Sequence, residues 1–232
     1  MPETTKLRRT GPARTRIEKA DDTRRALLRA AANVVGRYGY ADASVIRITS
    51  EAGIAHGTFY NYFETRQHLF DQLLPVRGEE ILNFIKEQVA GKTTGLARER
   101  LRITAYFEFC AKNPGFLRIL NEAEIFAPRA FKEHMKRFSD GYIRALRRGI
   151  QRGEILGYTE QELEVVVHVL MGARSYLTAL WDRRRGRRTV PSDIIATYLK
   201  MLETPLFASH QTARAKTTPA AGKASDPLKH DS

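Results

Sequence analysis

The sequence predicts an all-α fold. Apolar side chains recur along most of the 232 residues at the spacing of one helix face. No run of alternating apolar and polar residues indicates a β-strand, and no internal repeat is present. Glycine or proline separates many of the apolar runs, so helices are expected to end near Gly91, Pro114, Pro128, Gly153, Gly157, Gly186 and Pro191.

The first helix is expected to begin at Asp21 or Asp22, whose carboxylates can cap it, and to end at Tyr38. Gly39 then provides a left-handed stop. One apolar stripe supports this helix, formed by Leu27, Leu28, Ala31, Val34, Val35 and Tyr38.

The chain beyond the first helix is expected to be helical as well. Pro75 is expected to break or kink it, because proline lacks an N–H and clashes with the preceding turn. The remaining helices are expected at 44–52, 55–62, from 66 onwards, and near 76–90, 94–112, 115–125, 130–152, 160–182 and 192–205.

The formal charge of +13 favours a polyanionic partner, either nucleic acid or an anionic membrane surface. Cys110 is the only cysteine, which excludes an intramolecular disulfide and fits a reducing compartment. No stretch of about 18 apolar residues suggests a transmembrane helix, and the first residues lack the apolar core of a secretory signal. We therefore expect a cytoplasmic protein that is not inserted in a membrane.

The composition changes at both ends of the chain. Residues 1–20 are basic and poor in apolar side chains, and residues 208–232 are rich in Ala, Thr, Lys, Ser and Pro. We expect a disordered arm and a disordered tail there, because such segments cannot bury enough apolar surface to fold. Between them, residues 21–74 are expected to form a small helical domain and residues 75–207 a larger one.

The most informative segment is 44–63, which has the pattern of a helix-turn-helix. Gly53 suits the tight turn between two helices because it tolerates a positive φ. The apolar residues of the segment can point into one core, namely Val45, Ile48, Ala52, Ile54, Phe59 and Phe63. The second helix then presents the residues between them outward, and several of these can contact bases and phosphates in a major groove: His56, Gly57, Thr58, Tyr60 and Asn61.

This segment resembles the DNA-binding domain of the tetracycline-repressor (TetR) family. The resemblance rests on the run Gly53-Ile-Ala-His-Gly-Thr-Phe-Tyr-Asn-Tyr-Phe63, on Glu64-Thr-Arg-Gln-His-Leu-Phe70 after it, and on Arg37-Tyr-Gly-Tyr40 before it. It covers residues 22–72. It implies about nine helices, DNA binding by the first three, and a ligand and dimer domain formed by the others.

Carried onto this chain, the resemblance makes 55–62 the recognition helix and places Arg66 at the phosphate backbone. Ala55 stands where the family usually has a capping Ser or Thr, and Arg47 stands where an acidic residue commonly completes a capping box. The expected DNA-binding residues are Arg14, Arg16, Arg47, Ala55, His56, Gly57, Thr58, Tyr60, Asn61, Tyr62 and Arg66. Core packing of Tyr60, Tyr62 and Phe63 and ordinary solvation of Asn61 remain alternatives.

The larger domain is expected to bind a small, largely apolar effector, because residues 106–142 are dense in aromatic and sulfur-containing side chains. The candidate contacts are Phe107, Cys110, Phe116, Asn121, Phe131, Met135, Phe138, Tyr142 and His168. Each aromatic residue can instead be plain core, and His168 can be a hydrogen-bonded core residue. Arg118 and Glu122 are further candidates for polar groups of the pocket.

Two apolar stripes near the end of the domain are expected to form a homodimer with their symmetry mates. One consists of Leu163, Val166, Val167, Leu170, Ala173 and Leu177, and the other of Ile194, Ile195, Tyr198, Leu199 and Leu202. Burial of one stripe within the monomer is the alternative. The basic run 183–188 fits a solvated loop, a contact with anionic ligand groups, or a contact with DNA.

These features predict a ligand-responsive regulator that binds palindromic double-stranded operator DNA as a homodimer, and repression is the family's usual mode. A basic helical protein on anionic membranes is the alternative, but it needs a helix with one cationic and one exposed apolar face. No Cys/His cluster, Gly-rich phosphate loop, nucleophile motif or Glu-x-x-His pair points to an enzyme, a metal or another cofactor.

Overall fold

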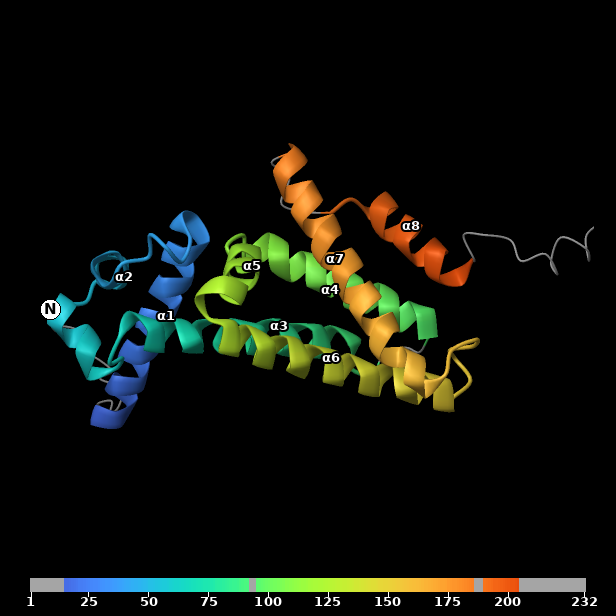
Figure 1. Cartoon of the computed structure of the whole chain (residues 1–232), viewed down its shortest axis with the longest axis horizontal. Helices are drawn as coiled ribbons and strands as arrows, with labels where there is room; N and C mark the ends of the chain where they lie inside the picture. The colour runs from blue at the N-terminus through green and yellow to red at the C-terminus, as the bar shows by residue number, and fades with distance from the viewer. Residues whose placement is uncertain (1–14, 92–94, 186–189, 205–232) are drawn as a thin grey trace, which may run out of the picture.

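The computed structural model describes residues 15–91, 95–185 and 190–204, with the backbone alone for 182–185. Within these residues the secondary structure is entirely helical, so the all-α prediction is confirmed (Figure 1). The elements in chain order are α1 (Arg16–Tyr38), α2 (Val45–Ala52), the 3₁₀ helix η1 (His56–Asn61), α3 (Arg66–Val89), α4 (Gly95–Lys112), α5 (Phe116–Phe126), α6 (Pro128–Gln151), the 3₁₀ helix η2 (Glu160–Glu162), α7 (Leu163–Arg185) and α8 (Ser192–Glu203).

The helix-turn-helix consists of α2, the turn at Gly53 and η1, all at one end of the elongated molecule (Figure 1). Ser44 caps α2 by accepting a hydrogen bond from the Arg47 N–H, and Gly53 ends it with a φ of 66°. Ile48, Phe59 and Phe63 are fully buried. They share one core with the buried face of α1, so helix positions are set by apolar burial on facing sides.

The first helix begins earlier than expected, at Arg16 rather than at Asp21 or Asp22. Thr15 caps it by accepting from the Glu18 N–H at 3.2 Å, and the Glu18 carboxylate accepts from the Thr15 N–H at 2.8 Å. This capping box was missed because few apolar side chains accompany it. Residues 16–20 are therefore helical and not part of a disordered arm, whereas residues 1–14 and the tail 208–232 lie outside the described residues.

Pro75 does not break the helix, because α3 runs through this proline from Arg66 to Val89. The missing hydrogen bond of Pro75 is offset by packing on both sides of it, where Leu73, Leu74 and Ile81 have no exposed surface. The expected domain boundary therefore falls inside a continuous helix, which joins the helix-turn-helix end to the rest of the molecule.

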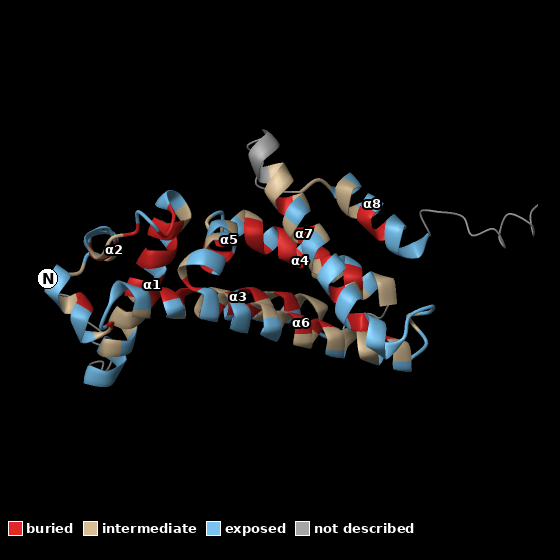
Figure 2. Ribbon diagram, in the orientation of Figure 1, coloured by how far each residue is buried: buried red, intermediate tan, exposed pale blue. Residues whose placement is uncertain are grey.

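The larger part of the molecule is built on α3 and α6, which lie side by side along the long axis (Figure 1). α4 packs on α3 and α5 packs on α6, while α7 packs on α6 and α4, and α8 packs on α4. Buried residues follow the facing sides of these helices (Figure 2). The segment Glu160–Trp181 is, against expectation, long and apolar enough to cross a membrane by length and composition alone, with 28% of its most apolar window buried. Core helices of soluble proteins pass the same test.

Candidate functional site

The outer side of η1 is a compact polar surface. His56, Gly57, Tyr60 and Asn61 are exposed and Thr58 is half-buried, so these side chains face solvent at the end of the molecule. Between them, Phe59 is fully buried and holds η1 on the core. The exposed groups include an amide, a hydroxyl and an imidazole, which can exchange hydrogen bonds with base edges and phosphates.

No side chain caps η1, so its position depends on aromatic contacts with the core. Ala55 is the N-cap residue and makes no capping hydrogen bond. The ring of Phe59 lies 5.6 Å from the ring of Phe63, and the Arg24 guanidinium lies 5.3 Å from the Phe63 ring. Tyr62 is half-buried against the same core, so only part of it can reach a ligand.

Exposed arginines flank this surface. The Arg47 guanidinium lies 4.9 Å from the centre of the Tyr38 ring, and Arg66 lies 5.4 Å from the Phe70 ring and donates to the Ala41 carbonyl. Arg16 is exposed in the first turn of α1. Arg14 lies outside the described residues, and so do the side chains of the basic run 183–188.

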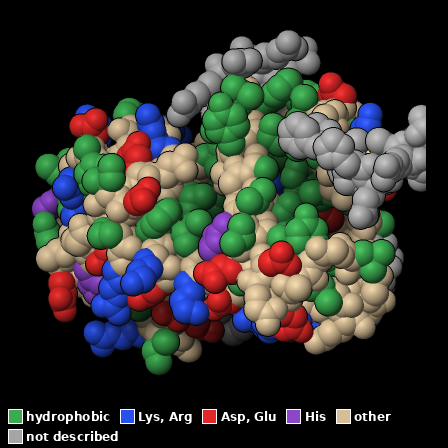
Figure 3. Space-filling model, turned by 45° about the vertical axis from the view of Figure 1, so that its right-hand side comes forward, with side chains coloured by type: hydrophobic (Ala, Val, Ile, Leu, Met, Phe, Trp, Pro, Cys, Tyr) green, Lys and Arg blue, Asp and Glu red, His purple; other side chains and the backbone are tan. Residues whose placement is uncertain are grey.

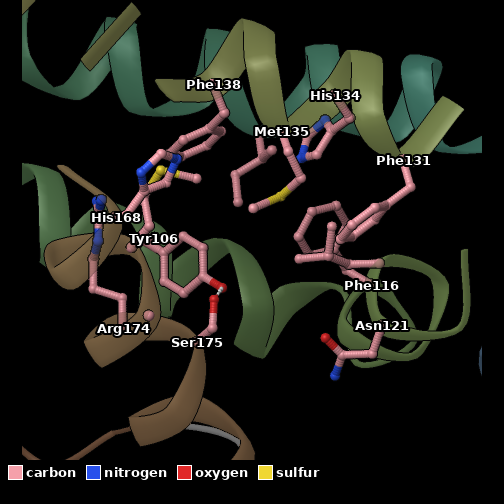
Figure 4. A pocket seen from close by; sticks show the side chains of 14 residues that line it. Tyr106, Phe116, Asn121, Phe131, His134, Met135, Phe138, His168, Arg174 and Ser175 are labelled. Carbon is pink, nitrogen blue, oxygen red and sulfur yellow. Dashed lines mark hydrogen bonds between the residues drawn. The ribbon is translucent and has the colours of Figure 1, made fainter. Parts of the chain in front are cut away.

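A second candidate site is a cavity of about 280 Å³ in the larger part of the molecule, here called the central pocket (Figure 4). Its walls come from five helices, α3 to α7. Its lining consists of Ile81, Tyr106, Phe116, Leu120, Asn121, Phe131, His134, Met135, Phe138, His168, Met171, Gly172, Arg174 and Ser175. The volume is near the lower end of the range for small-molecule sites, and the mostly apolar lining is typical of them.

Six of the expected effector contacts line the central pocket: Phe116, Asn121, Phe131, Met135, Phe138 and His168. Phe107, Cys110 and Tyr142 do not line it and are buried in the core. A count of aromatic and sulfur-containing side chains could not separate pocket wall from core, because the same residue types form both.

Sequence reasoning did not name His134, Met171, Gly172, Arg174 or Ser175 as pocket residues. The helical spacing around His168 was a usable signal, because Met171, Gly172 and Ser175 follow it at i+3, i+4 and i+7 on α7. Arg174 gave no such signal. A lone arginine on a helix is usually solvent-exposed.

His134 is a neutral polar group in the wall of the central pocket. It is 6% exposed and packs on Gly78 of α3, where a Cβ atom would lie only 2.2 Å from its Nδ1. Burial, with a smaller contribution from Arg137, lowers the pKa of His134 to about 4. At neutral pH its imidazole can therefore both donate and accept a hydrogen bond.

A buried ionic cluster lies behind the pocket and docks α8 onto α4. The Glu99 carboxylate accepts from the hydroxyls of Tyr142 at 2.6 Å and Tyr198 at 3.2 Å, and it pairs with Arg102 at 2.6 Å. Burial is the main cause that raises the pKa of both tyrosines, so they remain protonated donors. Each polar atom of Glu99 thus has a partner.

Arg118 and Glu122 do not line the central pocket, contrary to expectation. They form what we call the α1–α5 contact, in which α5 holds the C-terminal end of α1. Glu122 accepts from the Tyr40 N–H at 2.8 Å and pairs with Arg118, which donates to the Arg37 carbonyl at 2.6 Å. Gly36 faces Gly115 so closely that a Cβ atom on Gly36 would lie 2.7 Å from the Gly115 Cα.

The expected dimer stripes are largely turned inward. Leu163, Val167 and Leu170 on α7, and Tyr198 and Leu199 on α8, are at most 8% exposed within one chain. Leu177, Ile195 and Leu202 keep partial exposure. α7 carries apolar residues on two sides, and periodicity alone does not tell which side packs on the chain's own core.

The exposed side of α7 is apolar as well. Val165, Val169 and Tyr176 are 67%, 63% and 69% exposed and follow one another at helical spacing. On α8, Met201 and Leu202 are 59% and 42% exposed. Hydrophobic side chains also gather across the middle of the face in Figure 3.

Comparison with known proteins identifies the family. The sequence profile described as "Bacterial regulatory proteins, tetR family" matches residues 27–73, which hold the helix-turn-helix. The fatty acid metabolism regulator protein of Bacillus subtilis is 26% identical over 134 residues, which are 56% of this chain and 69% of that protein. Residues 27–73 of this chain are a TetR-family DNA-binding domain. This domain makes the chain a DNA-binding regulator.

Solved structures of two FadR regulators share the fold over most of their length. The fatty acid degradation regulator FadR from Bacillus halodurans aligns with a TM-score of 0.69 at 19% identity, over 86% of this chain and 98% of that protein. FadR from Bacillus subtilis, whose structure is a complex with stearoyl-CoA, aligns with a TM-score of 0.69 at 20% identity, over 79% of this chain and 99% of that protein.

The lowered pKa of His134 predicts a pH-dependent stability. An unfolded histidine takes up a proton near pH 6.5, whereas folded His134 does so only near pH 4, so acid favours the unfolded state between these values. Relative to a His134→Gln variant, the wild type should lose about 3 kcal/mol of unfolding free energy from pH 7 to pH 4. Urea denaturation of both proteins at several pH values measures this difference. A difference that stays constant with pH would contradict the prediction.

Proposed function

We propose that this TetR-family chain binds a palindromic operator as a homodimer, represses transcription from it, and leaves it when an effector occupies the central pocket. The exposed polar face of η1, held by buried Phe59 and flanked by Arg47 and Arg66, is the observation that carries the proposal. Two copies related by a two-fold axis would insert η1 into successive major grooves. The protein would act in the cytoplasm.

We propose that the exposed faces of α7 and α8 pack against a second copy of the chain. Monomeric soluble proteins rarely expose apolar side chains in a contiguous patch, and Val165, Val169 and Tyr176 form a row along a helix. Two helices from each copy would pair as a four-helix interface, in which the same patch meets itself. This interface would set the distance between the two η1 helices.

The effector is proposed to be a small molecule with a hydrocarbon chain. The lining of the central pocket is mostly apolar, with Phe116, Phe131 and Phe138 among its larger side chains. A relative of the same fold, FadR from Bacillus subtilis, has a structure in complex with stearoyl-CoA. Both observations favour an acyl chain over a polar metabolite.

α5 is the proposed route from the pocket to DNA. One side of this helix lines the central pocket with Phe116, Leu120 and Asn121, and Glu122 on another side holds the end of α1. A ligand that moves α5 would therefore move α1 and the helix-turn-helix packed on it. This short path replaces the expected one through Pro75, whose helix is continuous.

The DNA-binding mode is tested on duplex DNA from upstream of the protein's own gene. Asn61→Ala or Thr58→Ala should change sequence preference, because these side chains would contact bases. Arg66→Ala should weaken binding to all sequences alike. It should also reduce the slope of log affinity against log salt concentration by about one, the contribution of one phosphate contact. Fluorescence anisotropy at several salt concentrations measures both effects.

Lys132→Ala is the matched control for the loss of one positive charge, because Lys132 is exposed on α6, outside the proposed DNA and dimer surfaces. It should leave the salt dependence unchanged. The assignment of η1 is wrong if Asn61→Ala alters neither affinity nor preference.

The dimer is tested with the double variant Val169→Glu/Tyr176→Glu. Both side chains are mostly exposed, so the fold should persist while like charges meet across the proposed interface. Light scattering should give half the wild-type mass, and operator affinity should fall. Ile125→Glu, which also places a charge at an exposed apolar position, should remain a dimer. A dimeric double variant would refute this interface.

The switch is tested by Glu122→Ala, with Glu124→Ala on the exposed side of α5 as its control. Ligands are first selected by thermal shift from decanoic and stearic acid and their CoA esters. In the wild type a bound ligand should lower operator affinity about 5- to 150-fold. Glu122→Ala should keep the ligand affinity and lose most of this effect, since the α1–α5 contact is broken. Equal effects in both variants would exclude α5 as the route.

A further inference from the structure

The central pocket contains a buried positive charge that has no counter-ion among the residues the structure describes. Arg174 of α7 lines the pocket and is 1% exposed. Its Nε donates to the Leu170 carbonyl at 3.1 Å, but its two terminal nitrogens have no hydrogen-bond partner among the described residues. Buried polar groups are nearly always hydrogen-bonded, and a buried charge is costly unless it is paired.

Aromatic rings around Arg174 do not supply the missing partner. Its guanidinium carbon lies 4.7 Å from the centre of the Tyr142 ring, 5.7 Å from Tyr106 and 5.9 Å from Phe138. Ring faces attract the charge, but they leave the terminal N–H groups without acceptors. These contacts hold the guanidinium in place with its terminal nitrogens fully buried, so a ligand reaches them only when neighbouring side chains move.

The neighbouring carboxylate is already committed. Glu99 pairs with Arg102 and accepts from Tyr142 and Tyr198. The charge of Arg102 is thereby neutralised, and among the described residues Arg174 has no corresponding anion. The site therefore has a net positive charge beside a cavity of about 280 Å³.

Deepening the proposed function, we infer that the effector is a free carboxylic acid whose carboxylate pairs with Arg174 and whose hydrocarbon chain lies among the aromatic residues of the central pocket. A guanidinium fork matches a carboxylate with two parallel hydrogen bonds. Tyr106 and Ser175, which face each other at 3.4 Å, lie at the same end of the pocket as Arg174 (Figure 4). Phe116 and Phe131 lie at the other end, where the chain would pack.

The charge of Arg174 distinguishes a free acid from its CoA ester. Tyr106, Phe116 and Arg174 are at most 5% exposed, whereas Asn121, His168 and Gly172, which also line the pocket, are exposed. A CoA ester has no carboxylate at the carbonyl end of its chain, so it cannot form the paired charged hydrogen bonds with Arg174. A cavity of about 150 Å³ holds benzene, so this one suits about a dozen non-hydrogen atoms, the size of decanoate.

Calorimetric titration of the full chain with decanoate, decanol and decanoyl-CoA tests the inference. In the wild type, decanoate should bind about 10- to 100-fold more tightly than decanol, because charged hydrogen bonds add to the same chain contacts. Equal affinity for decanoate and decanol, tighter binding of decanoyl-CoA than of decanoate, or no binding of decanoate would each overturn it.

Two variants locate the effect. Arg174→Met removes the charge and keeps a long side chain, so it should remove the preference for decanoate and leave decanol binding intact. Phe131→Ala should weaken both ligands alike. Loss of an uncompensated buried charge should also raise the melting temperature of the ligand-free protein. An Arg174→Met protein that still prefers decanoate would refute the inference, and the wild-type comparison decides it if this variant does not fold.

An operator-binding assay separates this inference from the proposed function. Decanoate that binds through Arg174 without changing operator affinity would uphold the carboxylate site and refute the switch. Decanol that releases the operator as well as decanoate does would uphold the switch and refute the carboxylate site.

Discussion

The contact between α1 and α5 is the constraint on which the rest of the structure depends. Gly36 and Gly115 bring the two backbones together, and Glu122 holds the Tyr40 N–H at the end of α1. Tyr40 has no exposed surface, and its ring stacks on Phe126 at the end of α5, with 5.8 Å between the ring centres. The helix α1, on which the helix-turn-helix packs, is therefore in direct contact with α5 in the wall of the central pocket, without an intervening linker.

Apolar burial and buried polar groups have different roles in this molecule. Apolar burial positions the helices, as Phe59 does for η1 and Leu73 and Leu74 do for the segment around Pro75. Buried polar groups then set what the positioned helices can do: the Glu99 cluster fixes α8, and Arg174 faces a cavity without an anion. Apolar packing tolerates many side chains of similar size, whereas each of these polar groups needs a particular partner.

The fold class and the helix-turn-helix could be predicted from sequence because their signals are local. Gly53 and the spacing of Ile48, Phe59 and Phe63 depend only on neighbouring residues. The pocket was half predictable, since aromatic density pointed to α5 and α6 but not to the side of α7 that faces them. Arg174 could not be predicted, because its burial depends on helices far away in sequence.

The wrong predictions for the dimer stripes and for Pro75 share one physical cause. Local sequence shows that a helix face is apolar or that a residue strains the helix, but it does not show which other helix packs there. Leu163 and Val167 looked like a subunit interface and pack inside the chain, whereas Val165 and Val169 are the exposed residues. Pro75 looked like a boundary because local strain was visible in sequence and the packing that offsets it was not.

Gly36 and Gly115 also limit how a protein of this design can evolve. A side chain at either position would meet backbone, so neither helix surface can vary there without separating α1 from α5. Asn121 and His168 border the opening of the pocket and face solvent, where substitution costs little stability. New ligand specificities can therefore arise at the opening, while the mechanical connection to DNA stays fixed.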